Sequence, residues 1–189
     1  MRIISGTARG TNLFTLEGLE TRPTLDRVKE SVFNIIQNEI SGSIFLDLFS
    51  GSGAVGLEAA SRGAKKVILC DKSKDAIKII NKNIEKTHLK EKIELYNVDY
   101  KELLKNMINE KLDIIYIDPP YNSDLVINSV KLLISKQLVN KNSLIVIETD
   151  QEDKILKQLE EEKLKIEIID KRKYGRAIII FLKLKESQN

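Results

Sequence analysis

The segment Asp118-Pro119-Pro120-Tyr121 brings together a carboxylate, two prolines and an aromatic ring. Each proline fixes φ at about −65° and has no N–H, so the pair forms a stiff corner whose carbonyl groups stay free. The Asp118 carboxylate and the Pro119 carbonyl could accept both N–H bonds of an exocyclic amino group on a base. That arrangement would turn the nitrogen lone pair toward an electrophile such as a sulfonium methyl group.

The residues of this segment also suit the later steps of such a reaction. A methylated amino nitrogen is cationic and acidic, so a carboxylate of ordinary pKa, ~3.9, suffices to take its proton. Tyr121 could stack on an extruded base, because stacking returns ~1–3 kcal/mol against a similar extrusion cost. No metal is needed, and the single histidine, His88, lacks the partners of a metal motif and is expected in an ordinary loop. A rigid turn between a strand and a helix is the alternative for the segment.

A glycine-rich segment upstream could hold a nucleotide-like cofactor. Gly51, Gly53 and Gly56 match G-x-G-x-x-G between an apolar run and a helical segment, and Asp71 follows Gly51 after twenty positions. The pattern supplies a tight turn, a helix N-terminus for an anionic group and an acid for a ribose hydroxyl. NAD and S-adenosylmethionine both meet these requirements, so the loop alone leaves both open.

Short apolar runs alternate with helical periodicity from residue 44 onward, which is typical of βαβ units around a parallel sheet covered on both faces. The expected strands are Ile44–Phe49, Lys66–Cys70, Ile93–Asn97, Ile114–Ile117 and Ser143–Glu148. The expected helices are Ala54–Arg62, Lys74–Lys86, Tyr100–Met107, Asp124–Lys136 and Gln151–Glu161. The glycine loop and Asp118 follow strands directly, at the edge where ligands bind in open α/β sheets.

The C-terminal part departs from this alternation. Leu164–Asp170 and Ala177–Leu184 are apolar segments joined only by Lys171–Arg176. A parallel crossover needs a dozen or more residues, so this connection predicts an antiparallel pair. The basic run that contains Arg172 would then lie in the turn of a hairpin.

The N-terminal part differs as well. Two short β-like stretches, Arg2–Ser5 and Asn12–Leu16, precede a helix over Leu25–Glu39 for which Thr24 is the candidate N-cap. We therefore expect one α/β domain over residues 1–189. It would consist of an N-terminal β/α extension, residues 1–43, and a core, residues 44–189.

The composition excludes several classes of protein. With 189 residues, 42% of them hydrophobic, the chain can build one sizeable core. No apolar run approaches the ~20 residues of a membrane span, and the start of the chain lacks the pattern of a signal peptide. The lone Cys70 agrees with a reducing compartment, so we expect a cytoplasmic protein, monomeric by default. A net charge of +3 permits a nucleic-acid partner without indicating one.

The glycine segment also resembles the first motif of class I methyltransferases, because Asp47 and Phe49 complete the pattern D-x-F-x-G-x-G. The resemblance implies a Rossmann-like, seven-stranded, mostly parallel sheet with an antiparallel C-terminal strand. It implies S-adenosylmethionine as the cofactor, with S-adenosylhomocysteine as the product. Asp47 would hold the amino end of the methionine moiety and Asp99 the adenine amino group, although Asp99 could also cap the next helix. The implied cofactor contacts are Thr24, Asp47, Phe49, Ser50, Gly51, Ser52, Gly53, Gly56, Asp71, Lys72 and Asp99.

Over nearly its whole length the chain resembles the bacterial 16S ribosomal RNA guanine-N2 methyltransferases of the RsmD type. The matching segments are Arg2-Ile3-Ile4-Ser5-Gly6, Ala8-Arg9-Gly10, Arg22-Pro23-Thr24, Asp26-Arg27-Val28, Phe33-Asn34, the glycine loop, D-P-P-Y and Lys173-Tyr174-Gly175. The resemblance implies methylation of a specific guanine (the guanine-966 type) in 16S rRNA, within a 30S subunit or an assembly intermediate. Asp118, Pro119, Pro120 and Tyr121 would be catalytic, and Arg9, Arg22, Arg27, Arg172 and Tyr174 would contact RNA.

Three other functions remain open. Adenine-N6 methyltransferases of DNA or RNA share D-P-P-Y and every cofactor residue, although the DNA enzymes usually carry an added recognition domain for which 189 residues leave no room. A small NAD(P)-dependent oxidoreductase could use the same glycine loop, but it has no use for D-P-P-Y. A non-catalytic RNA-binding module could keep the fold, which the intact Asp118 and glycines argue against.

Overall fold

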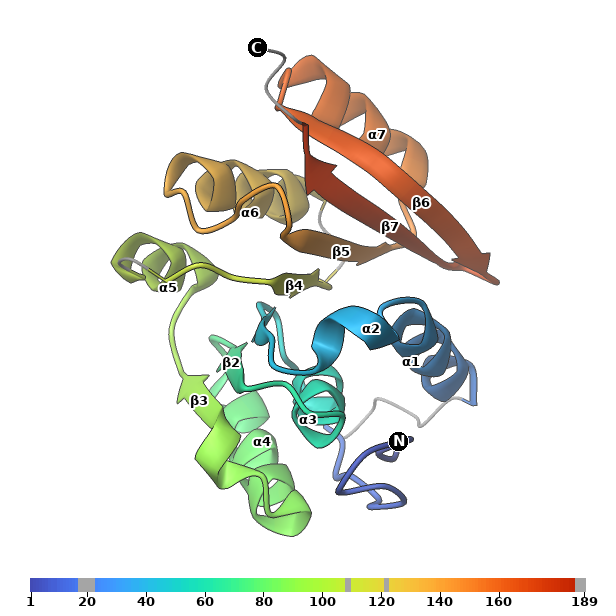
Figure 1. Ribbon diagram of the computed structural model, residues 1–189, viewed down its shortest axis with the longest axis vertical. Coiled ribbons are helices and arrows are strands. Elements are labelled where there is room, and N and C mark those ends of the chain that lie inside the picture. Colours follow the sequence, from blue (N-terminus) through green and yellow to red (C-terminus); the bar gives the residue numbers. More distant parts are fainter. Residues whose placement is uncertain (17–22, 108–109, 121–122, 186–189) are drawn as a thin grey trace.

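The computed structural model describes residues 1–16, 23–107, 110–120 and 123–185, with the backbone alone for residues 23–25 and 123. Its centre is a seven-stranded sheet between two layers of helices (Figure 1). The strands are β1 (Ile44–Asp47), β2 (Lys66–Cys70), β3 (Ile93–Tyr96), β4 (Ile114–Ile117), β5 (Leu144–Thr149), β6 (Ile166–Tyr174) and β7 (Ala177–Leu184). The helices are α1 (Pro23–Ile35), α2 (Gln37–Ile40), α3 (Ala54–Ser61), α4 (Lys74–Thr87), α5 (Tyr100–Asn106), α6 (Ser123–Ser135) and α7 (Glu152–Glu161), with a short 3₁₀ turn at Lys90–Lys92.

The strand order is β3-β2-β1-β4-β5-β7-β6. Strands β1 to β5 pair in parallel, and β7 runs antiparallel to both β5 and β6. This order confirms the expected class I methyltransferase architecture. The parallel dinucleotide-binding fold has the order 3-2-1-4-5-6 without a reversed strand, so the topology favours S-adenosylmethionine over NAD. The order reverses between β1 and β4, which places the ligand crevice at the carboxyl ends of those strands.

Two hydrophobic clusters cover the two faces of the sheet. On one face pack side chains of α1, α2, α3 and α4: Val28, Ile40, Leu57 and Ile80. On the other face pack side chains of α5, α6 and α7: Leu103, Val130 and Ile155. All four residues of β4 are buried, as expected for a central parallel strand with no solvent-facing side. None of the helices in the described ranges is long and apolar enough to cross a membrane.

The N-terminal helix differs from the sequence prediction. It begins at Pro23 rather than Leu25, so Thr24 lies in its first turn and is not the N-cap. Proline suits the first helical position because the N–H that it lacks would have no partner there. The expected continuous helix is interrupted at Ile36, whose φ of −93° and ψ of 12° separate α1 from α2.

The C-terminal hairpin is confirmed, but its turn is shorter than expected. β6 continues to Tyr174, which leaves only Gly175 and Arg176 between the strands. Gly175 has a φ of +65°, the left-handed conformation that tight hairpin turns require. The basic run around Arg172 therefore lies along β6 and not in the turn.

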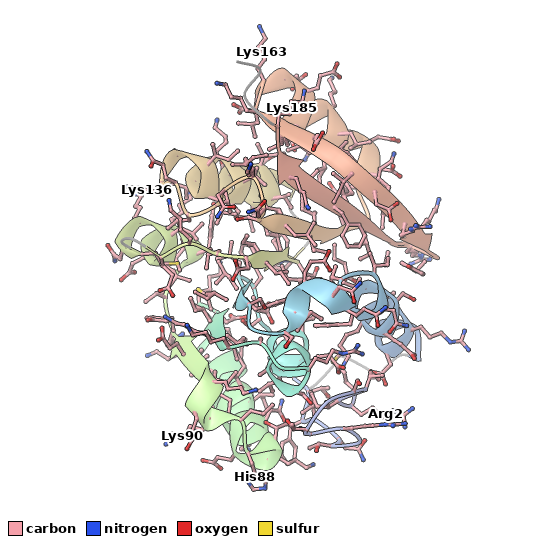
Figure 2. The ribbon with its side chains drawn as sticks, in the orientation of Figure 1. Arg2, His88, Lys90, Lys136, Lys163 and Lys185 are labelled. Atoms are coloured by element: carbon pink, nitrogen blue, oxygen red, sulfur yellow. The ribbon has the colours of Figure 1, made fainter. Side chains whose placement is uncertain are left out.

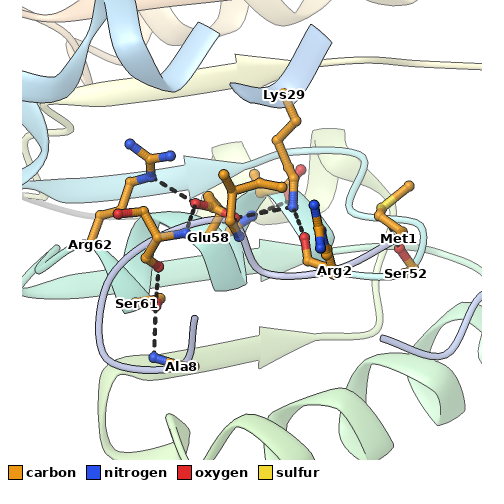
Figure 3. Close-up of polar contacts among 12 residues, drawn as sticks. Met1, Arg2, Ala8, Lys29, Ser52, Glu58, Ser61 and Arg62 are labelled. Atoms are coloured by element: carbon orange, nitrogen blue, oxygen red, sulfur yellow. Dashed lines mark hydrogen bonds and ion pairs between the residues drawn. The ribbon is translucent and has the colours of Figure 1, made fainter. Parts of the chain in front are cut away.

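The first 13 residues form a compact loop rather than two regular strands. An isolated bridge joins Arg2 to Asn12, and the loop is attached to α3 through Glu58 and Ser61 (Figure 3). At the far end of α4, His88 caps the helix C-terminus with a φ of +56° and is exposed (Figure 2). This position agrees with the expectation of an ordinary loop histidine.

Candidate active site at the carboxyl edge of the sheet

Ser50 fixes the start of the glycine loop. Its hydroxyl donates to the carbonyl of Asp47 at 2.8 Å and accepts the N–H of Cys70 at 3.0 Å, which ties the ends of β1 and β2 together. The next residue, Gly51, has a φ of +55°, and a Cβ added there would meet no atom within 4 Å. The chain therefore turns sharply at Gly51 and presents bare backbone to open space, as a loop must if a ligand is to approach it closely.

Gly56 allows α3 to pack closely against β2. A Cβ at this position would lie 2.2 Å from Cδ2 of Leu69 and 3.0 Å from Cγ1 of Val67, so only glycine lets α3 approach β2 this closely. The Gly56 N–H also donates to Oδ2 of Asp47 at 3.0 Å. This position beneath the loop favours a role in helix–strand packing over direct contact with a cofactor, which the sequence resemblance had implied for Gly56.

Asp47 is a buried carboxyl group, with 2% of its surface exposed. Burial, together with the negative charge of Asp71, raises its pKa to about 7, although the hydrogen bond from Gly56 opposes the shift. An ionised Asp47 is therefore costly in the free protein. A cationic amino group placed beside it would offset that cost, which is the role that the resemblance gives to the methionine moiety.

Two further acids follow the ends of β2 and β3. Asp71 accepts the N–H of Gly51 at 2.9 Å and that of Ser73 at 2.8 Å, so it shapes the glycine loop from the side. Asp99 is exposed and accepts the N–H of Lys101 at 2.9 Å as the N-cap of α5. Each carboxylate has about four acceptor positions, so both residues keep capacity for a ligand.

The remaining expected cofactor contacts lie around the same edge. Phe49 packs against Tyr100 with ring centroids 5.3 Å apart, which fixes one wall beside the loop. Lys72 is exposed directly after Asp71. The backbone carbonyl of Ser52 accepts a hydrogen bond at 2.9 Å from the buried Asn83, which also binds both backbone groups of Phe14.

The Asp118–Pro120 corner directly follows β4, across the switch point from Asp47. Ile117 of β4 lies opposite Ile147 of β5 in the parallel register, so the next residues along the two strands, Asp118 and Glu148, are neighbours. Pro119 is buried, whereas Asp118 and Pro120 reach the surface. The structure thus brings Asp47, Asp71, Asp99 and Asp118 to one edge of the sheet.

Glu148 and Tyr116 belong to this site, and the sequence interpretation missed both. Tyr116 is buried in β4, and its hydroxyl donates to Oε2 of Glu148. The sequence pattern around these residues gives little indication of a site. Glu148 is a single acid at the end of the fifth apolar run, and Tyr116 lies within the fourth. Only the register of β4 and β5 shows that it stands beside Asp118.

The surroundings of Asp118 correct the expectation of an ordinary carboxylate. One side of the residue is open to solvent, but the surrounding protein removes much of its hydration. This desolvation, together with the negative charges of Glu148 and Asp47, raises the pKa of Asp118 well above its usual range. The pKa of Glu148 is raised as well, by desolvation, with the hydrogen bond from Tyr116 acting in the opposite direction. Asp118 and Glu148 therefore form a pair of adjacent acids, and the ionisation of each is disfavoured.

The expected RNA contacts are dispersed. Arg27 of α1 is exposed, as is Arg172, whose Nε donates to Asp170 at 2.9 Å. Tyr174 is half-buried and packs against the hydrophobic cluster on the α1 face. Arg9 is exposed and follows Ala8, whose N–H donates to Ser61 at the C-terminal end of α3. The glycine loop adjoins the other end of α3, so the position of Arg9 argues against contact with a cofactor at that loop, and its RNA contact stays a prediction.

Three of the expected site residues lie beyond these observations. Arg22 and Tyr121 are outside the described residues, and so is the side chain of Thr24. Their assigned roles, Arg22 in RNA contact, Tyr121 in base stacking and Thr24 in cofactor contact, stay predictions from the sequence.

Comparison with known proteins places the chain in a family. The family model described as Conserved hypothetical protein 95 matches residues 1–183. Ribosomal RNA small subunit methyltransferase D of Haemophilus influenzae is 35% identical over 158 residues, which cover 82% of each chain. A protein of Bacillus subtilis, described as a candidate rRNA methyltransferase, is 36% identical over 154 residues, 80% of this chain and 84% of the relative.

A solved structure shows the same relationship in three dimensions. A crystal structure from H. influenzae, described as a candidate methylase, superposes with a TM-score of 0.76 at 30% identity, and the match covers 98% of this chain and 99% of that one. The sequence and the fold thus both match those of the relatives over most of the chain. The protein belongs to the family described as Conserved hypothetical protein 95, together with the proteins named ribosomal RNA small subunit methyltransferase D.

Proposed function

We propose that this protein transfers the methyl group of S-adenosylmethionine to N2 of a specific guanine in 16S rRNA, the guanine-966 type, in the small ribosomal subunit or an assembly intermediate. The observation that carries the proposal is the position of Asp118 and Pro119 at the end of β4, directly across the switch point from the glycine loop. The names of the relatives support an rRNA substrate. The protein would act in the cytoplasm as a monomer.

The residues at this edge fit S-adenosylmethionine. The bare backbone at Gly51 leaves a space that a Cβ would fill, and the buried Asp47 lacks a counter-charge among its described contacts. Asp47 suits the cationic amino end, Asp71 the ribose hydroxyls and Asp99 the adenine amino group. When bound, the cofactor supplies an electrophilic methyl group on a sulfonium.

The chain's own residues would orient the nitrogen and remove its proton. The Asp118 carboxylate and the Pro119 carbonyl each accept one N–H of the guanine N2 amino group, so the lone pair points at the methyl carbon. The N2 lone pair forms the new N–C bond as the S–C bond breaks. One N2 proton then leaves to the Asp118 carboxylate, which neutralises the methylated amino group.

RNA contact would come from residues outside this corner. Residues 1–43 would contact RNA as an extension, with Arg9, Arg22 and Arg27 as phosphate ligands. Arg172 and Tyr174 on the C-terminal hairpin would add to this surface. Residues 44–189 would form the catalytic core, in which Pro120 stiffens the corner and Tyr121 stacks on the target base.

Mass spectrometry of nucleosides tests this proposal. 16S rRNA in small subunits that lack the modification should gain N2-methylguanosine when incubated with the protein and S-adenosylmethionine. Asp118→Asn should lower the rate by about 10²- to 10⁴-fold, the usual contribution of a positioned base, without changing the affinity for the cofactor. N6-methyladenosine as the product would overturn the choice of base, and tight binding of NADH without binding of S-adenosylmethionine would overturn the activity.

A further inference from the structure

Glu148 is the residue of the site to which neither the sequence motifs nor the proposed reaction gives a role. It follows Ile147, which pairs with Ile117, so it stands beside Asp118 at the ends of β4 and β5. Its side chain is half-buried. In the described part of the chain one hydrogen bond reaches this carboxylate, from the Tyr116 hydroxyl to Oε2. None of the hydrogen bonds among the described residues reaches the other oxygen, Oε1, which could therefore accept from a group that enters the site.

The nucleobases differ in the ring atom next to the exocyclic amino group. In guanine, N1 beside the N2 amino group carries a hydrogen and is a donor. In adenine, N1 beside the N6 amino group is an acceptor, and in cytosine, N3 beside the N4 amino group is also an acceptor. Asp118 and Pro119 need only an amino group, so they cannot distinguish these bases. A second carboxylate next to Asp118 can distinguish them by the ring atom beside the amino group.

We propose that Glu148 is the specificity-determining residue of this site and accepts the N1–H of the target guanine while Asp118 and Pro119 hold its N2 amino group. The N1–H donor of guanine would favour the ionised form of Glu148, whereas adenine would turn a ring lone pair toward this carboxylate. A site built to accept a hydrogen bond rejects strongly the analogue that lacks the donor, because its polar group is left without a partner. The inference rests on the proposed function and deepens it, since it explains how the motif shared with adenine enzymes would act on guanine.

Tyr116 is the positioning residue for Glu148. Tyr116 is fully buried in the hydrophobic cluster on the α1 face of the sheet, so its hydroxyl cannot turn to solvent and holds Oε2 in one place. With Oε2 fixed, Oε1 has a defined direction. Removal of the hydroxyl should therefore loosen the selection of the base without removing the acceptor itself.

A base analogue separates selection of the base from methylation itself. 2-Aminopurine keeps the amino group at C2, but it has an acceptor at N1 and lacks O6 of guanine, so the Glu148 and Tyr116 variants are needed to assign a preference to N1. Small subunits reconstituted with either guanine or 2-aminopurine at the target position are methylated by the wild-type protein, and kcat/KM is compared. We expect a preference for guanine of about 100-fold or more. Equal use of the two bases by the wild-type protein would overturn the proposal without any variant.

The variants make the test specific. In Glu148→Gln the amide can either accept from guanine N1–H or donate to the N1 of 2-aminopurine, so the preference should fall by about 10-fold or more. Tyr116→Phe should lower it by a smaller factor. Glu160→Gln, the same change at an exposed position of α7, should leave it unchanged. An unchanged preference in Glu148→Gln, with the affinity for S-adenosylmethionine intact, would also overturn the proposal.

The two proposals fail in different ways. If the wild-type protein forms no N2-methylguanosine, the proposed function is wrong. If N2-methylguanosine forms and Glu148→Gln keeps the full preference for guanine over 2-aminopurine, the proposed function stands and the role of Glu148 is wrong. If Glu148→Gln does not fold, the wild-type preference and the Tyr116→Phe variant still decide the matter.

Discussion

At the scale of single residues, the site is dominated by carboxyl groups that resist ionisation. Asp47, Asp118 and Glu148 lie at the ends of three neighbouring strands, and each has a raised pKa because burial removes solvent from its charged form. Such a cluster lowers the stability of the free protein, because the carboxylates repel one another. It favours binding of a ligand that is cationic or carries hydrogen-bond donors, because such a ligand offsets this repulsion. Strongly shifted carboxyl groups in one place are typical of functional sites.

Asp47 allows a quantitative test of this view. Its pKa is about 7 in the folded protein against an ordinary value of 3.8, so the folded state binds a proton more tightly than the unfolded state does. The free energy of unfolding should therefore fall as pH rises from about 4 to about 7, by up to about 4 kcal/mol. Asp47→Asn keeps an acceptor for the Gly56 N–H and removes the titration. Urea unfolding at several pH values should show the wild-type protein losing stability relative to this variant.

The control for Asp47 is a carboxyl group at the surface. Asp150→Asn changes an exposed aspartate in the same way and should leave the pH dependence of the wild-type protein intact. Asp47→Asn should also weaken the binding of S-adenosylmethionine. Parallel curves of unfolding free energy against pH for the wild-type protein and Asp47→Asn would contradict the prediction.

At the scale of elements, the close approach of α3 to β2 holds the glycine loop in place. Among the described glycines, Gly56 is the one without a positive φ, so alanine there is unstrained in its backbone and suffers only from the lack of space. Gly56→Ala should lower the free energy of unfolding by about 1–3 kcal/mol because its Cβ collides with Leu69. Urea denaturation measures this change.

A double-mutant cycle shows whether Leu69 is the cause. Leu69→Ala removes the colliding Cδ2 and is itself destabilising, as a large-to-small change in the core. The double variant should be more stable than the sum of the two single effects predicts, by about 0.5–3 kcal/mol. Strict additivity would mean that the loss in Gly56→Ala has another origin.

At the scale of the whole molecule, one buried acid joins three separate parts of the chain. Glu58 of α3 is fully buried and accepts hydrogen bonds from the N–H groups of Ile4 and Ser5, from Lys29 of α1 and from Arg62 (Figure 3). Burial lowers the pKa of Lys29, and the attraction of Glu58 opposes that shift. Glu58 thus links both the N-terminal segment and α1 to α3, in addition to the contacts that Ser61 and Asn83 make with the N-terminal segment.

This arrangement predicts a large effect from a small change. Glu58→Gln removes the ion-pair partner of the buried Lys29 and should cost about 3–5 kcal/mol in the free energy of unfolding. Amide hydrogen exchange at Ile4 and Ser5 should accelerate, because both N–H groups lose a charged acceptor. Glu39→Gln on the exposed face of α2 serves as the control.

A second substitution in the Lys29–Glu58 ion pair should restore part of the lost stability. When both partners of a buried pair are replaced by uncharged groups, most of the cost disappears. Lys29→Met combined with Glu58→Gln should therefore be more stable than Glu58→Gln alone. A double variant as unstable as the single one would show that Glu58 acts through the N-terminal amides and not through Lys29.

The sequence by itself determined the order of the elements, a mainly parallel sheet with an antiparallel end, and the acids at or just after the ends of β1 to β4, while its motifs resembled those of class I methyltransferases. These features are local: apolar periodicity over a few residues, short motifs and connection lengths decide them. The break at Ile36 and the two-residue turn after Tyr174 were missed, because helix and strand ends depend on packing that local patterns do not contain.

Only the tertiary structure decided which distant residues meet. The register of β4 and β5 places Glu148 beside Asp118, and the position of the first loop on α3 takes Arg9 away from the glycine loop. The raised pKa of Asp118 likewise depends on neighbours that are distant in sequence. Burial and electrostatic repulsion arise from side chains that are brought together in space, so motifs identify the candidate acids, and the fold determines their chemistry.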